Sequence, residues 1–331
     1  MRLDDRISFP DTPYDVVTMG ELLIDMISTD YVPTLKEAVH FQKSFGGSPG
    51  NIAVNLAKMK HRSALITSIG QDDFGRFLLD FLREQNVETK GIQINSGHTS
   101  MVFVTKSTEN PIFLPLRHAD LSLTLTDEQF QLISDAKIFH FTAWALSYPS
   151  IRRVTMELLQ HAHRHQKLIT FDPNYREVLW EPGHDGPGFI RRDILPLVDI
   201  IKPSEIDAEH LLGRQSLDAY AEQFKDTGNL LVIMTLGANG LMAIDDHEVY
   251  RMPSHARAVV DTTGAGDAFW AGFMASLLTN SPIRQALLHG SYSAAYKLGT
   301  MGAICELPDD QALEAWINQP GEEKQDANSL F

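Results

Sequence analysis

The chain alternates between short apolar runs and longer segments in which apolar residues recur every three or four positions. Short runs bounded by turn residues are typical of buried strands, and the longer segments are typical of helices packed on a sheet. Strands are predicted at Asp15–Met19, Ala64–Ile69, Ile138–Phe141, Leu168–Phe171, Asp199–Ile201 and Leu231–Thr235. Helices are predicted near Asn51–Met59, Gly75–Gln85, Ser150–His165, Glu205–Leu212, Asp267–Leu278 and Arg284–Lys297. The alternation indicates an α/β fold with a central, mostly parallel sheet and helices on both faces.

Four further segments break this alternation. Their strand-like patterns lie at Met26–Ser28, His40–Ser44, Met101–Lys106 and Ile112–Arg117, and Glu109-Asn110-Pro111 is a turn between the last two. They predict a small second sheet that stands off the main domain, with strands from about residues 22–45 and 99–118. The polar residues after Pro320 predict a frayed tail over residues 319–331, which leaves 14–318 as the main domain.

Residues 261–273 read Asp-Thr-Thr-Gly-Ala-Gly-Asp-Ala-Phe-Trp-Ala-Gly-Phe, a glycine turn followed by an apolar helix. The backbone N–H groups of Gly264, Ala265 and Gly266 would point outward there and, with the helix dipole, would bind a phosphate or a developing negative charge. A carboxylate at Asp267 would repel a phosphate that merely bound. It suits a general base that takes a proton from a hydroxyl while the turn holds the phosphoryl group. The alternative is that Asp267 only caps the helix.

A second glycine stretch, Gly46-Gly47-Ser48-Pro49-Gly50-Asn51, also precedes a helix. Its glycines let the backbone approach a ligand closely, and the Asn51 amide can donate to and accept from a hydroxyl; an ordinary loop–helix junction is the alternative. The two motifs, more than 200 residues apart and in this order, resemble the ribokinase-like (PfkB) carbohydrate kinases, and within them the bacterial fructokinases. The resemblance extends over about residues 14–308, with supporting stretches at Met19–Asp25, Gly70–Gly75, Asp172–Arg176 and Thr235–Gly240.

The resemblance implies a ribokinase-like three-layer sandwich in which the small sheet is a lid over the sugar and part of a homodimer interface. It implies ATP-dependent transfer of a phosphoryl group to a sugar hydroxyl, with Asp267 as base and the turn at Gly264–Gly266 as anion hole. The sugar-binding residues would be Asp25, Gly47, Asn51, Arg117, Asn174 and Arg176, and the nucleotide-binding residues Ser204, Thr235, Gly237 and Gly240. Three of these residues keep an alternative role: Asp25 as a surface acid, Arg176 in a loop-anchoring ion pair, and Arg117 in positioning the lid.

The resemblance also implies Mg²⁺ bound with ATP, and a monovalent cation such as K⁺ near the anion hole, held partly by Asp261 and mostly by backbone carbonyls. Many family members carry Asn-x-x-Glu where this chain has Ser204-Glu205-Ile206-Asp207. Both replacements shorten the reach of the side chains. Either Asp207 or Glu205 could therefore orient Mg²⁺ through water.

The composition limits the classes of partner that the protein could bind. The formal net charge of −15, from 28 basic and 43 acidic residues, disfavours nucleic acid or an anionic membrane as partner, whereas ATP arrives with Mg²⁺. The single Cys305 excludes an internal disulfide and a multi-cysteine zinc site. No apolar run approaches the ~18 residues of a membrane span, and the N-terminus lacks the apolar core of a signal peptide. We therefore expect a cytoplasmic enzyme.

The predicted reaction is phosphorylation of fructose. Segment 46–51 has no lysine or arginine to suit a carboxylate, which favours a neutral sugar. A 2-keto-3-deoxygluconate kinase of the same family is the nearest alternative, because Asp172–Trp180 suits either enzyme. A catalytically weak sugar-sensing protein is the alternative from another class, although a pure binder needs no base at Asp267.

Overall fold

A computed structural model describes residues 2–106, 112–308, 312–313 and 315. Its large sheet has the strand order β13-β12-β11-β10-β9-β8-β1-β4-β5. All neighbours from β5 to β11 are parallel, and β12 and β13 are antiparallel additions at one edge. The strands are β1 (Val16–Met19), β4 (Ser63–Gly70), β5 (Ile92–Asn95), β8 (Ile138–Thr142), β9 (Leu168–Asp172), β10 (Ile200–Ile201), β11 (Leu231–Thr235), β12 (Leu241–Ile244) and β13 (Val249–Met252).

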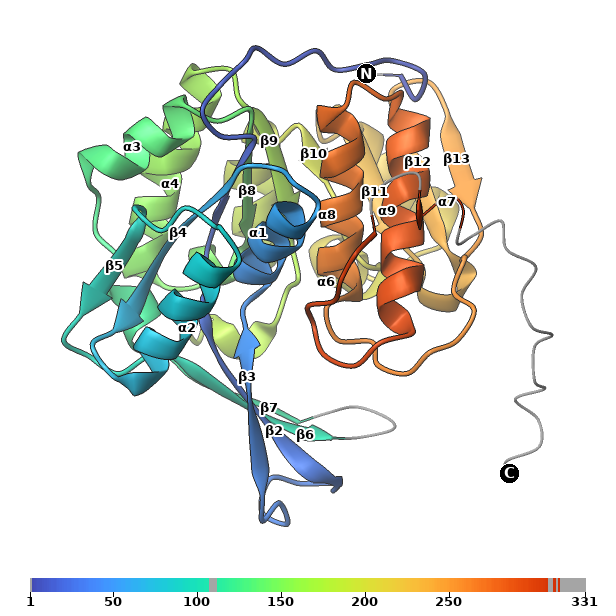
Figure 1. The fold of residues 1–331 in the computed structure, drawn as a ribbon. Helices are drawn as coiled ribbons and strands as arrows, with labels where there is room; N and C mark the ends of the chain where they lie inside the picture. Colours follow the sequence, from blue (N-terminus) through green and yellow to red (C-terminus); the bar gives the residue numbers. More distant parts are fainter. Residues whose placement is uncertain (1, 107–111, 309–311, 314, 316–331) are drawn as a thin grey trace, which may run out of the picture.

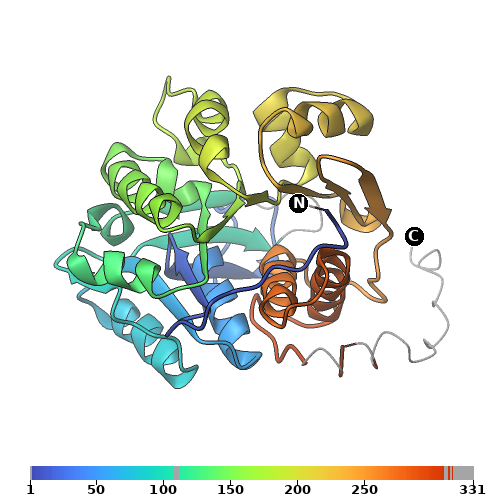
Figure 2. The same cartoon turned by 90° about the horizontal axis from the view of Figure 1, so that it is seen from above.

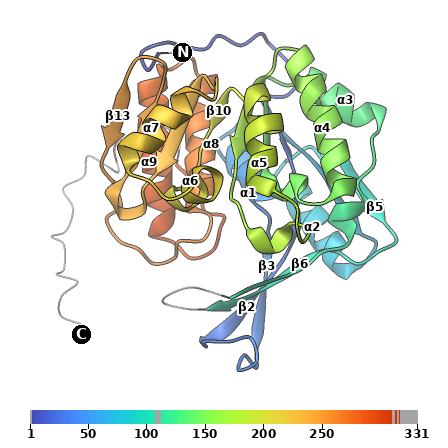
Figure 3. The same ribbon diagram turned by 180° about the vertical axis from the view of Figure 1, so that it is seen from behind.

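Helices cover both faces of this sheet, which gives three layers (Figure 2). One face carries α1 (Ser48–Lys58), α2 (Asp73–Glu84), α8 (Ala265–Leu278) and α9 (Ile283–Leu298). The other carries α3 (Asp127–Ser134), α4 (Pro149–Arg164), α5 (Gly186–Phe189), α6 (Glu205–Leu212) and α7 (Leu217–Lys225) (Figure 3). The predicted fold class is therefore confirmed.

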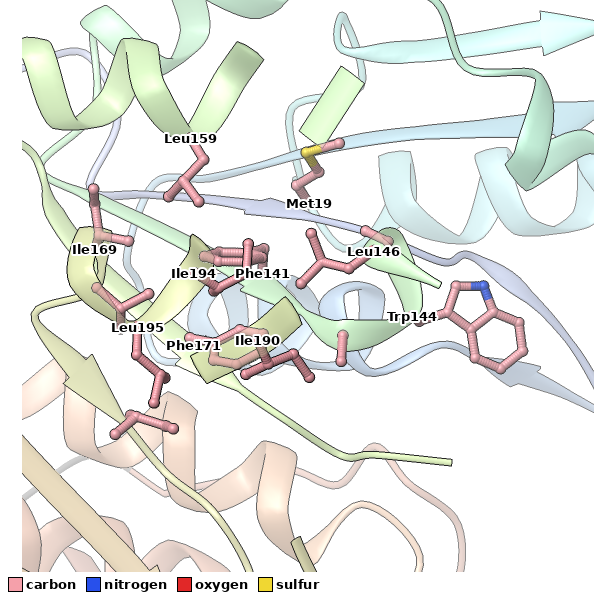
Figure 4. Packing of buried hydrophobic residues seen from close by; sticks show 14 of the residues in the cluster. Met19, Phe141, Trp144, Leu146, Leu159, Ile169, Phe171, Ile190, Ile194 and Leu195 are labelled. Atoms are coloured by element: carbon pink, nitrogen blue, oxygen red, sulfur yellow. The ribbon is translucent and has the colours of Figure 1, made fainter. Parts of the chain in front are cut away.

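Alternate residues of the central strands enter two separate cores. In β1, Val17 and Met19 join the cluster beneath α4, whereas Val16 joins the cluster beneath α1 and α8. Figure 4 shows the first cluster, where Phe141 and Phe171 of neighbouring strands pack together. Burial on both faces explains why these strands read as nearly continuous apolar runs.

The small sheet has the order β3-β2-β6-β7 and projects from the end of the main domain where β1 and β4 finish (Figure 1). Its strands are β2 (Leu23–Tyr31), β3 (Phe41–Gly46), β6 (Met101–Lys106) and β7 (Phe113–Leu116). β2 pairs with β6 in parallel, and the outer pairs are antiparallel. The turn predicted at Glu109-Asn110-Pro111 and the tail at 319–331 lie outside the described residues.

No helix in the described part of the chain combines the length and the apolar character needed to cross a membrane.

Candidate active site

The glycine turn at the start of α8 is locally constrained. Gly264 has φ 75°, in the left-handed region, and a Cβ there would lie 2.6 Å from the Ala303 carbonyl oxygen. Only glycine fits without a shift. The Ala265 N–H donates to the Thr262 carbonyl at 3.2 Å, while no hydrogen bond to a described residue engages the N–H of Gly264 or Gly266. Two of the three predicted donors are thus available to a ligand.

Asp267 joins the two glycine motifs. Its Oδ1 accepts a hydrogen bond from Ser48 Oγ at 2.6 Å, and its Oδ2 accepts one from Asn51 Nδ2 at 2.8 Å. Both donors lie in the first turn of α1, so residues more than 200 positions apart meet at one carboxylate. Burial raises the pKa of Asp267, against the opposing effect of the two hydrogen bonds. The side chain nevertheless keeps partial contact with solvent.

Two more carboxylates lie beyond the end of β1. Glu21 is buried and accepts hydrogen bonds from Ser48 N at 3.2 Å and Thr142 Oγ1 at 3.1 Å; burial raises its pKa to about 8. The carboxylate of Asp25, on β2, makes no hydrogen bond or ion pair with a described residue. Burial, then the charge of Asp267, raises the pKa of Asp25 to about 7. Asp25 lies over Gly46, where a Cβ would come within 2.4 Å of its Oδ2.

A buried ion pair lies at the carboxyl ends of β9 and β10. Lys202 Nζ is 2.9 Å from Asp172 Oδ2, which also accepts a hydrogen bond from Trp270 Nε1 at 2.9 Å. Lys202 reaches towards the turn of α8, because a Cβ on Gly266 would lie 3.5 Å from its Nζ. Lys202 was not among the predicted site residues. The sequence feature that could have indicated it is the position of this lysine directly after a buried strand, Ile200–Ile201.

Asp207 has a different environment from the one expected of a metal-orienting group. Its Oδ2 accepts hydrogen bonds from the Ser204 N–H and hydroxyl at 2.8 and 2.6 Å, a capping box at the start of α6. Its Oδ1 accepts one from Tyr175 N at 2.7 Å. Both carboxylate oxygens are thus engaged, whereas Glu205 is exposed. Among the described residues, no three His, Cys, Asp or Glu side chains cluster as metal ligands would.

The predicted nucleotide residues lie at the carboxyl ends of neighbouring strands. Ser204 and Thr235 form a parallel bridge, and Thr235 N donates to the Pro203 carbonyl at 2.9 Å. Gly237 and Gly240 follow with φ of 56° and 88°. A Cβ on Gly237 would meet no atom within 4 Å, so this position borders open space.

The two predicted arginines differ. The Arg117 side chain is buried, with Nη2 2.6 Å from Asp120 Oδ2 and Nη1 2.5 Å from Ser147 Oγ. Its guanidinium lies 4.6 Å from the Trp144 ring centroid. It anchors the end of β7 to the main domain and lines a cavity of about 480 Å³. Arg176 is exposed and makes no ion pair with a described residue. It follows Asn174, which has φ 33°.

Asp261 lies three residues before Gly264, at the start of the glycine motif 261–273. Its carboxylate accepts hydrogen bonds from Thr263 N at 2.9 Å and from Gly302 N at 2.8 Å. These bonds, followed by the charge of Lys297, outweigh burial and lower the pKa of Asp261.

Comparison with known proteins agrees with this architecture. The model of the pfkB family carbohydrate kinases matches residues 14–310. The ATP-dependent 6-phosphofructokinase of Thermoanaerobacterium thermosaccharolyticum is 41% identical over 312 residues, which are 94% of this chain and 96% of that protein. The structure of Halothermothrix orenii fructokinase superposes with a TM-score of 0.76 at 39% identity, over 84% of this chain and 98% of that one.

A double-mutant fructokinase of Vibrio cholerae O395, solved with fructose, ADP and potassium ion bound, superposes with a TM-score of 0.78 at 26% identity, over 93% of this chain and 99% of that one. The chain belongs to the PfkB family of carbohydrate kinases. It is an ATP-dependent sugar kinase.

Proposed function

We propose that this protein is a fructokinase that transfers the γ-phosphoryl group of Mg·ATP to a hydroxyl of fructose. The observation that carries the proposal is the Asp267 carboxylate, held by Ser48 and Asn51 at the start of α8 with a raised pKa. A carboxylate with a raised pKa, beside free backbone N–H groups, suits proton removal from an alcohol during phosphoryl transfer.

In this proposal, Asp267 takes the proton of the attacking hydroxyl, and the N–H groups at the turn stabilise the charge on the transferring phosphoryl group. The Lys202 ammonium adds positive charge beside Gly266. The sugar is held by Asp25, Gly47, Asn51, Asn174 and Arg176. The ATP phosphates are bound near Ser204, Thr235, Gly237 and Gly240.

Two expected roles are refined by the local contacts. Glu205 is the better candidate to orient Mg²⁺ through water, since Asp207 is engaged in holding the Tyr175 loop to α6. Arg117 positions the lid rather than binding sugar, since Asp120 and Ser147 already engage its guanidinium. Because the reaction consumes ATP, we place the enzyme in the cytoplasm.

The test is a kinase assay of the wild type and Asp267→Asn with fructose and Mg·ATP. Asn keeps the shape and loses the base, so kcat should fall by at least about 10²–10⁴, with ATP affinity and melting temperature nearly unchanged. Ser276→Ala, a substitution elsewhere in the apolar body of α8, is the matched control. Near-normal turnover by Asp267→Asn would refute the assignment of the base.

A second candidate substrate is fructose 6-phosphate. The relative at 41% identity is an ATP-dependent 6-phosphofructokinase, and Arg176 has no ion-pair partner among the described residues, so it is available to a sugar phosphate. Comparing kcat/KM for fructose, fructose 6-phosphate and 2-keto-3-deoxygluconate at fixed Mg·ATP decides between them. A preference for a phosphorylated sugar that is lost in Arg176→Gln would reassign the substrate while leaving the role of Asp267 intact.

We also propose that the small sheet is a lid and that its outer face pairs with a second copy of the chain. Leu114 and Leu116 alternate along β7 and are 45% and 40% exposed, and Tyr31 at the end of β2 is 64% exposed. Burying such side chains in a dimer is favourable. Light scattering should give a dimer for the wild type and a monomer for Leu114→Asp/Leu116→Asp. A monomeric wild type would exclude this interface.

A further inference from the structure

Lys297, in the last turn of α9, is a charged side chain with no exposure to solvent. Its Nζ donates hydrogen bonds to the carbonyl oxygens of Asp261 at 2.8 Å and Thr300 at 3.1 Å, and lies 3.9 Å from Asp261 Oδ2. A lysine in the last turn of a helix commonly caps that helix's own carbonyls. Here one acceptor belongs to residue 261, so the contact joins separate parts of the fold.

These acceptors are the kind that a bound monovalent cation would use. Backbone carbonyls and a carboxylate are hard oxygen ligands, and an ammonium carries the same single positive charge as K⁺. The family resemblance predicts a K⁺ site held partly by Asp261 and mostly by carbonyls. In this chain those groups do not fit an added K⁺, since the Lys297 ammonium already occupies the position between the Asp261 and Thr300 carbonyls. A second cation there would meet like charge in a buried site.

The position matters because it adjoins the anion hole. The Asp261 carboxylate accepts hydrogen bonds from the N–H groups of Thr263 and Gly302, so it links the segment that leads into the turn at Gly264–Gly266 to the loop after α9. Gly264 packs directly on Ala303 of that loop: a Cβ added to Gly264 would lie only 2.7 Å from the Ala303 Cα. A cation between these segments therefore fixes the backbone whose N–H groups face the phosphoryl group in the proposed reaction.

We infer that Lys297 is a built-in monovalent cation that replaces K⁺ and positions the anion hole, so that this kinase needs no K⁺. The inference rests on the proposed function for the role of the turn at Gly264–Gly266. Lys297 is a positioning residue: it acts through Asp261 and the turn.

The first test compares activity in K⁺ and in choline at equal ionic strength. The wild-type kcat values in the two salts should agree within about twofold. A tenfold difference would correspond to about 1.4 kcal/mol. Clear stimulation of the wild type by K⁺ would overturn the inference.

The second test uses Lys297→Ala, which removes the ammonium and leaves space. In choline its kcat should fall by about 10²-fold, as expected for a misplaced catalytic backbone, and NH₄⁺ or K⁺ should restore activity in a saturable manner. The same ions should raise the melting temperature of this variant and leave that of the wild type unchanged. Full activity of Lys297→Ala without cation, or a loss that no cation relieves, would overturn the inference.

Lys297→Gln is the conservative companion, because it keeps a hydrogen-bond donor without charge and is the variant to use if Lys297→Ala fails to fold. It should lose activity while keeping its secondary structure; wild-type kcat in Lys297→Gln would overturn the need for a cation. The melting-temperature measurement requires no sugar. A chain that phosphorylates none of the tested sugars would therefore count against the proposed function alone.

Discussion

The ionisable groups around Asp267 fall into two sets, one acidic and one basic. In the acidic set, which we propose to bind the sugar, Glu21 and Asp25 make no ion pair with any described residue, and both have raised pKa values. In the basic set, which we propose to face the phosphates, two buried ammonium groups, Lys202 and Lys297, lie near the turn of α8. Carboxylates accept hydrogen bonds from neutral hydroxyls, and ammonium groups attract phosphates. The difference suggests how one small site sorts a neutral sugar from an anionic nucleotide.

Removing Lys202 should have the largest effect. Lys202→Met deletes positive charge beside the turn, so we expect kcat to fall by about 10²–10³, the size seen when one stabilising donor is lost. The substitution also leaves the Asp172 carboxylate buried without its ion-pair partner, which should lower the free energy of unfolding by about 3–5 kcal/mol. Steady-state kinetics and urea unfolding measure the two effects.

The double variant Lys202→Met/Asp172→Asn separates the effect of Lys202 on kcat from its effect on stability. It should recover much of the free energy of unfolding, because no buried carboxylate is left unpaired, while kcat stays low. Recovery of kcat as well would mean that Lys202 only neutralises Asp172, and the charge contrast across Asp267 would lose its catalytic meaning.

Asp25→Asn should act on the opposite side and more weakly. It loses charged hydrogen bonds worth about 1.5–3 kcal/mol, so the KM for sugar should rise by about 10- to 150-fold while the KM for ATP stays unchanged. Because the pKa of Asp25 is raised to about 7, wild-type sugar binding should weaken as the pH falls below that value. Equal increases in both KM values would indicate a folding defect instead.

Glu21→Gln should have the smallest effect on the kinetics and should act instead on the pH dependence of stability. The pKa of Glu21 rises from an ordinary 4.5 to about 8 in the folded state, so its stabilising contribution is complete below 4.5 and is lost as the pH rises through about 8. The free energy of unfolding of the wild type should therefore fall relative to Glu21→Gln between these values. Urea unfolding of the two proteins measures this difference. If it stayed constant across this pH range, the result would contradict the raised pKa of Glu21.

Sequence patterns located most of the elements that build the main sheet. The runs at Ile138–Phe141 and Leu231–Thr235 are strands because both faces are covered, and α8 and α9 follow their apolar patterns closely. The strands β5, β12 and β13, at or next to the sheet edges, were not predicted: each has only four residues, and β5 and β13 have polar residues among their apolar ones. The helices α3 and α7, which are short and amphipathic, and the single turn α5 were not predicted either.

The candidate site was predictable where chemistry lies in a local motif. Asp267 and Asn51 were predicted from their glycine stretches, and the structure brings them together. Ser48, in the same stretch as Asn51, was not selected, although it also donates to Asp267. Lys202 and Lys297 could not be recognised in this way, because a lysine after a strand or in a helix is ordinary until its acceptors are known. Those acceptors come from Asp172 and Asp261, distant segments that only the tertiary fold supplies. The capping role of Asp207 depends likewise on a contact with Tyr175.

The parallel pairing of β2 with β6 has a consequence for how the chain folds. Between these two strands the chain passes through β3, α1, β4, α2 and β5, so the small sheet cannot assemble as a local hairpin. Its two halves meet only once the first third of the main sheet has placed them side by side, and such non-local pairing is slow to form. We therefore expect β2 and β6 to pair during refolding only after the segment between them, from β3 to β5, has folded.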